Sequence, residues 1–143
     1  VGLFSRRCFN IDSLVVGETE DPSVSRMTIV SSGDERTIEQ IEKQLNKKLD
    51  VIKVKTFHEK QCFNRELLLI KVKYNKNNRR DIMEICESMK AEIVDVSKHY
   101  MLIELCDTPE RINAFMTLFA SISIVEVART GTVALSMCKE NED

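Results

Sequence analysis

The order of predicted strands and helices repeats along the chain, and this repetition constrains the fold more than any other feature. The second half, from Glu66 to Ala128, is predicted as strand, helix, strand, strand, helix, strand. The first half is predicted as the end of a helix, then strand, strand, helix, strand. Units of this order form an antiparallel sheet with both helices on one face. We therefore expect an α+β chain of two tandem ferredoxin-like β-α-β-β-α-β units, the first truncated at its N-terminus so that its opening strand is missing.

Hydrophobic periodicity and turn residues set the individual elements. In the first half we expect strands at residues 10–18, 26–31 and 50–56, and a helix that follows Asp34 and buries Ile38, Ile41, Leu45 and Leu49. In the second half we expect strands at 66–74, 92–97, 100–106 and 124–128, helices after Asn78 and Thr108, and a further extension at 132–137. The polar stretch 57–65 is predicted to be a linker. The expected domains are thus residues 1–56 and 66–137, followed by an acidic tail at 138–143.

Composition excludes several classes of protein. The 143 residues carry 21 Lys and Arg against 23 Asp and Glu, a net charge of −2, whereas a non-specific nucleic-acid binder is normally strongly basic. No apolar run approaches the roughly 20 residues that span a bilayer. The cysteines number five, an odd count without a C-x-x-C pair, which favours free thiols in a reducing compartment. We expect neither nucleic acid nor a membrane as a partner.

Candidate catalytic and metal-binding residues are few. His58 and Cys62 have helical i,i+4 spacing, but two ligands do not make a zinc site. His99 falls in a predicted turn without a nucleophile beside it, and no phosphate-binding glycine loop or nucleophile elbow is present. The carboxylates fall on outward positions of helices and strands, as on solvated faces. The sequence therefore predicts no catalytic residues and no metal site.

The stretch from Val1 to Asp50 resembles a known family. It contains N-I-D-S-L, then T-E-D-P, then S-R-M-T-I-V, and the chain closes with I-V-E-V-A-R-T-G. These motifs are similar to those of the regulatory (small) subunit of acetolactate synthase, also called acetohydroxyacid synthase. Cys8 stands where that family usually has Gly. The resemblance spans nearly the whole chain and is weakest from Phe57 to Lys90.

The resemblance implies a function. The first unit would be an ACT domain that forms a homodimer and binds a branched-chain amino acid, usually valine, at the interface. The partner would be the catalytic (large) subunit, which would carry thiamine diphosphate, Mg and FAD, while this chain would bind no cofactor. Activation and feedback inhibition of that subunit would regulate valine, leucine and isoleucine biosynthesis. The location would be the cytoplasm, or the plastid stroma in a plastid-bearing organism. The alternative is a free-standing ACT-type amino-acid sensor or regulator.

By the same resemblance, the effector-binding residues map to Asn10 and Ile11, with Val16 on the following strand. The side-chain amide of Asn10 can donate to a carboxylate and accept from an ammonium group. Ile11 and Val16 offer apolar surface of a size that suits a valine side chain. Burying a zwitterion requires hydrogen bonds to both charges. The alternative for Asn10 is that it ends the preceding helix in a left-handed conformation.

Overall fold

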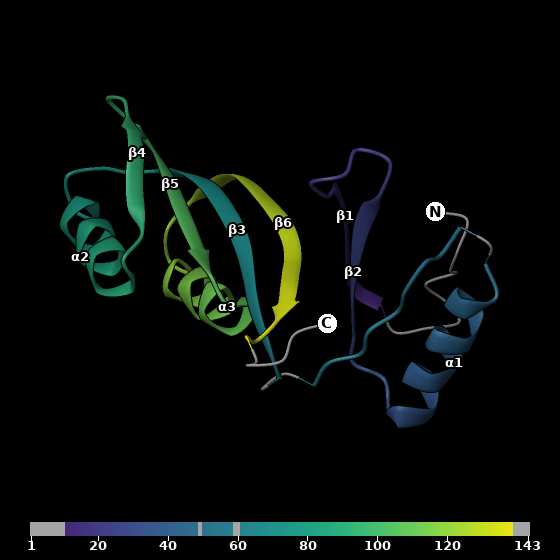
Figure 1. Cartoon of the computed structure of the whole chain (residues 1–143). Coiled ribbons are helices and arrows are strands. Elements are labelled where there is room, and N and C mark those ends of the chain that lie inside the picture. Colours follow the sequence, from purple (N-terminus) through teal and green to yellow (C-terminus); the bar gives the residue numbers. More distant parts are fainter. Residues whose placement is uncertain (1–10, 49, 59–60, 139–143) are drawn as a thin grey trace. The chain divides into compact units, whose positions relative to one another are not determined.

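The computed structural model describes residues 11–48, 50–58 and 61–138. The chain divides into two compact units, one of residues 1–63 with 134–143 and one of residues 64–133 (Figure 1). Both contain strands and helices, so the predicted α+β class is confirmed. Within the described residues, no helix is long and apolar enough to cross a membrane. The part of the acidic tail beyond Cys138 lies outside the described residues.

The first unit contains two strands and one helix within the described residues. Strand β1 (Ile11–Glu18) pairs antiparallel with β2 (Ser25–Ser31), and helix α1 (Glu35–Asn46) follows. Asp34 caps the helix as expected, because its carboxylate accepts from the backbone N–H of Thr37 at 2.9 Å. Ile41 is the one described residue of the predicted stripe that is buried; Leu49 lies outside the described residues.

The strand predicted at residues 50–56 is wrong. Residues 51–58 form neither strand nor helix, and Ile52 is 83% exposed. Alternation of apolar and charged residues indicates which side chains can share a face, but a strand also needs a neighbouring strand to hydrogen-bond with. The β1–β2 sheet has no third strand within the described residues. The segment is instead held to α1, where the Thr56 hydroxyl donates to the Glu42 carboxylate at 2.7 Å.

The second unit has the predicted ferredoxin-like order. It comprises β3 (Cys62–Lys73), α2 (Arg79–Met89), β4 (Glu92–Val96), β5 (Tyr100–Asp107), α3 (Pro109–Leu118) and β6 (Ile124–Ser136). The sheet order is β4-β5-β3-β6, with β3 and β4 both antiparallel to β5 (Figure 1). The prediction for this half is therefore confirmed in element type and order.

Two boundaries in this unit differ from the predictions. Strand β3 begins at Cys62, inside the stretch predicted as linker. Its pairing with β5 starts only at Glu66, although β3 is already a strand from Cys62. Strand β6 in turn continues unbroken through both segments expected near the C-terminus. Residues 62–65 were not predicted as a strand because their apolar and polar residues do not alternate.

The core of the second unit lies between its sheet and its two helices. Alternate residues of β3 and β5 are buried against one stripe from each helix. The residues of this core are Leu68, Ile70, Val72, Ile82, Cys86, Met101, Ile103, Leu105, Ile112, Phe115, Phe119 and Ile122. The rings of Phe115 and Phe119 lie 4.9 Å apart between centroids. This core closes one face of the sheet without help from the other unit's residues.

Candidate functional site

The predicted effector-binding residues lie on strand β1, as far as the structure describes them. Ile11 opens the strand and is half-buried, whereas Val16 is 57% exposed. Asn10 lies outside the described residues, so its assignment stays a prediction. Ile11 and Val16 are five positions apart and would face opposite sides of a regular strand.

A β-bulge brings these two side chains to the same face. Ile11 is opposite Ser31, but Ser13 is opposite Val30, so β1 has one extra residue at this point. Beyond the bulge, Leu14 is opposite Ile29 and Val16 is opposite Met27. Directly paired residues share a face, and every second residue returns to it. The register therefore groups Ile11 with Leu14, Val16, Met27 and Ile29.

This apolar group, which we call the β1–β2 apolar face, is open to solvent in the single chain. Leu14 is 40%, Val16 57% and Met27 39% exposed. Exposed apolar side chains gathered on one face mark interaction or ligand sites more often than isolated ones do. Met27 and Ile29 were not predicted as site residues, although their two-residue spacing in S-R-M-T-I-V places both on one face of a strand. The surface can bind an apolar group and offers no acid–base pair.

The T-E-D-P motif between the two strands has a structural role. The Thr19 hydroxyl accepts from the Asp21 N–H at 3.2 Å and donates to the Val24 carbonyl at 2.9 Å. The Asp21 carboxylate accepts from the hydroxyl of Ser23 at 2.8 Å and from its N–H at 3.0 Å. These hydrogen bonds lower the pKa of Asp21. The motif thus closes the β1–β2 turn with its own polar groups.

The closing motif of the chain also serves the fold. Arg129 donates to the buried carboxylate of Glu66 and to the Asn113 side chain, tying β6 to β3 and α3. The Thr130 hydroxyl accepts from the Leu67 N–H at 3.0 Å. Gly131 has φ 88°, a left-handed conformation that favours glycine. The R-T-G sequence therefore fixes β6 against its neighbour and supplies a glycine where the backbone needs one.

Among the described residues, no group of three or more His, Cys, Asp or Glu could hold a metal ion. That the chain has no catalytic or metal-binding residues stays a prediction. The thiol of Cys86 is buried in the core, and this burial raises its pKa to about 11, so it remains protonated at neutral pH. His99 lies in the β4–β5 turn, where its carbonyl accepts from the Tyr74 N–H at 2.9 Å.

Comparison with known proteins gives consistent matches over nearly the whole chain. Residues 1–53 match the AHAS small subunit-like ACT domain, and residues 65–137 match the small subunit of acetolactate synthase. A probable acetolactate synthase small subunit of Methanothermobacter thermautotrophicus is 43% identical over 136 residues, 94% of this chain and 81% of that protein. The acetolactate synthase isozyme 3 small subunit of Escherichia coli is 40% identical over 137 residues, covering 95% and 84%.

A solved structure agrees with these sequence matches. The crystal structure of an acetolactate synthase small subunit from Thermotoga maritima aligns with a TM-score of 0.86 at 39% identity. The alignment covers 96% of this chain and 86% of the other. This likeness confirms the predicted fold class of tandem ferredoxin-like units.

Proposed function

Because this chain belongs to the acetolactate synthase small-subunit family, we propose that it is a regulatory subunit that binds valine between two ACT domains. The bound amino acid inhibits a catalytic subunit that the effector-free chain activates. In this way the end product of branched-chain amino-acid biosynthesis limits the first steps of its own formation. The chain contributes no catalytic residue and acts by binding alone.

The observation that carries this proposal is the exposed β1–β2 apolar face. A sheet of two strands is marginally stable alone, and it gains stability when its apolar face or edge is covered. A second copy of the same unit would cover it and enclose a small apolar side chain at the same time. Ile11 and Val16 supply apolar surface on the same face, and Asn10 would supply hydrogen bonds to the charged groups of the amino acid.

The proposed partner follows from the family, because the matched proteins are named as small subunits of acetolactate synthase. The catalytic subunit would hold thiamine diphosphate, Mg²⁺ and FAD, and this chain would hold none of them. We propose the cytoplasm as its location, or the plastid stroma in a plastid-bearing organism. We also propose the domain limits 1–56 and 66–137, with the connecting segment between them shortened by the start of β3.

The test is Asn10→Ala in the complete protein assembled with its catalytic subunit. Loss of a hydrogen bond to a charged group costs about 1.5–3 kcal/mol, which is roughly a ten- to hundredfold loss in valine affinity. We expect valine inhibition to weaken by that factor while activation stays intact. The matched control is Asn77→Ala, an exposed asparagine of the second unit, which should leave inhibition unchanged.

Three results would contradict parts of this proposal. Unchanged valine sensitivity in Asn10→Ala would remove Asn10 from the site. A monodisperse monomer at micromolar concentration, with and without valine, would exclude the dimer interface. Valine binding by a chain that never associates with a catalytic subunit would favour the free-standing amino-acid sensor instead.

A further inference from the structure

The charges of helix α2 run against the dipole of the helix. A helix is stabilised by acidic side chains in its first turn and basic ones in its last. Helix α2 begins with Arg79 and Arg80, and carries Glu84 and Glu87 in its later turns with no basic residue in the last. Two charges of the favourable sign, Asp81 in the first turn and the C-cap residue Lys90, offset the two arginines and the two glutamates only in part. This order of charges disfavours the helix that carries it.

Helix α1 of the same chain follows the usual rule and provides a comparison. It has Asp34 as its N-cap, Glu35 in the first turn and Lys43 in the last, and the one base near its start is Arg36 at the second position. In α2 the N-cap residue, Asn78, makes no side-chain capping hydrogen bond. Its amide oxygen accepts instead from the Asn75 N–H at 2.8 Å. Sequences that break a local stability rule without a compensating contact often do so at functional sites.

The charges of α2 are not used in ion pairs of the fold. The ion pairs found among the described residues join Lys71 to Glu126, Arg111 to Asp107 and Arg129 to Glu66. Arg80 and Glu84 have i,i+4 spacing, yet they are not within ion-pair distance in the part of the chain described here. All five charged side chains of the helix are exposed. They are therefore available to another molecule.

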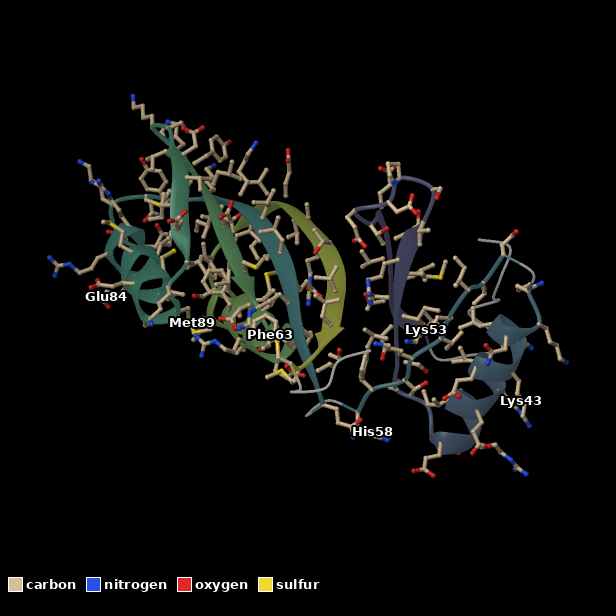
Figure 2. All side chains as sticks on the ribbon, in the orientation of Figure 1. Lys43, Lys53, His58, Phe63, Glu84 and Met89 are labelled. Carbon is tan, nitrogen blue, oxygen red and sulfur yellow. The ribbon has the colours of Figure 1, made fainter. Side chains whose placement is uncertain are left out.

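Four of the same side chains line an open, shallow groove of about 360 Å³ on the outer side of α2. Its lining residues are Lys76, Arg79, Arg80, Met83, Glu84 and Glu87. The opposite side of the helix buries Ile82 and Cys86 in the core, and Figure 2 shows Glu84 projecting away from the sheet. Met83 is 47% exposed and lies between the cationic and the anionic ends of the groove. We call this surface the α2 groove.

We propose that the α2 groove docks a segment of the acetolactate synthase catalytic subunit. The segment carries acidic side chains that meet Lys76, Arg79 and Arg80, an apolar side chain that contacts Met83, and basic side chains that meet Glu84 and Glu87. The inference rests on the proposed function, which supplies the catalytic subunit as the partner. It adds a contact surface on the second unit, far in sequence from the valine-binding residues.

The order of charges points to a protein segment and not to a small anion. The eight helical steps from Arg79 to Glu87 rise about 12 Å along the helix, which is longer than a phosphate or carboxylate group. Glu84 and Glu87 would repel a free anion, whereas both signs of charge are used when a polypeptide with the complementary order binds. Complementary charges of this kind set the orientation and the rate of association.

The experiment measures binding of the complete protein to its catalytic subunit, by calorimetry at low and at physiological salt. Arg80→Glu should weaken binding about tenfold at low salt, with a smaller loss at high salt because exposed charges are screened. The melting temperature of the isolated chain should stay the same or rise, since the new acid suits the helix start. The matched control is Arg36→Glu, the same change at the second position of α1, which should not alter binding.

A second variant keeps the test decisive if the first variant folds poorly. Glu87→Lys places a base in the last turn of α2, so it too should preserve or raise the melting temperature while weakening binding. Wild-type affinity in both variants would overturn the docking surface and leave the proposed function standing. Failure of the wild-type chain to bind any catalytic subunit would overturn both.

Discussion

The two units of this chain bury their apolar residues to very different extents. Of the thirteen buried hydrophobic residues among those described, twelve belong to the second unit and only Ile41 to the first. The first unit instead exposes Leu14, Val16 and Met27 on one face of its sheet. The second unit is a fold completed by its own helices. The first unit presents apolar surface that a second copy and an amino acid could cover, which is the arrangement expected of a regulatory interface.

The largest difference is expected between two truncations. Phe115→Ala removes a ring of α3 from the core of the second unit, and Val16→Ala shortens a side chain of the β1–β2 apolar face. Phe115 is fully buried, and removing a buried phenylalanine ring costs about 3–5 kcal/mol. Val16→Ala should change the free energy of unfolding of the monomer by less than about 0.5 kcal/mol and weaken dimerisation instead. Urea denaturation and sedimentation measure the two effects. Similar losses of stability would show that the two units do not differ as described.

The next test concerns the ion pair of Arg129 with Glu66. The Glu66 side chain is 6% exposed, so Arg129→Ala leaves a buried carboxylate without its charged partner. The expected loss is about 3 kcal/mol in the free energy of unfolding of the second unit. The control is Lys71→Ala, which breaks an exposed pair with Glu126 at 3.9 Å and should cost less than about 1 kcal/mol. Equal effects would mean that burial of Glu66 does not decide the strength of its pair.

A smaller effect is expected from Lys90, which ends α2 with φ 60° and is the one described non-glycine residue with positive φ. A left-handed conformation costs a side-chain-bearing residue about 1 kcal/mol, and glycine avoids that cost. Lys90→Gly should therefore stabilise the second unit by up to about 1 kcal/mol. Thermal unfolding would measure the change, and a destabilised variant would show that the Lys90 side chain makes a contact that matters more.

The smallest effect is the pH dependence that Asp107 contributes. Partial burial alone would raise the pKa of Asp107, but hydrogen bonds from Arg111 and the Thr108 N–H outweigh it and lower the pKa below 3.8. Stability from this carboxylate is thus present above pH 3.8 and lost as the pH falls through its lower folded value. Asp107→Asn should lose less than about 1 kcal/mol at pH 7 and show a shallower loss in acid. An identical acid titration in the variant would exclude this contribution.

Much of the second unit could be predicted from sequence because its signals are local. The alternation of Leu68, Ile70 and Val72 marks a strand with one buried face, and Thr108 followed by Pro109 marks a helix start. The side chain of Thr108 indeed accepts from the N–H of Arg111. These local signals do not show which strands pair. Residues 50–56 alternate like a strand but have no partner strand among the described residues. Residues 62–65 belong to β3 although they do not alternate.

The candidate site in the first unit was only partly predictable for the same reason. Ile11 and Val16 came from a family motif, whereas the bulge that aligns them with Met27 depends on the register between two strands. A bulge of one residue changes which side chains share a face, and the local sequence does not indicate where such a bulge lies. The charge order of α2 was readable in the sequence, but its groove required the three-dimensional arrangement.

Native-state hydrogen exchange of the complete protein tests the central contrast most directly. Amides of β3 and β5 should exchange only on global unfolding, at a rate independent of protein concentration and of valine. Amides of β1 and β2 should exchange much faster in dilute protein and become protected as the protein concentration rises and valine is added, because binding stabilises the bound state. Equal protection of the two sheets, unaffected by concentration or valine, would contradict the account.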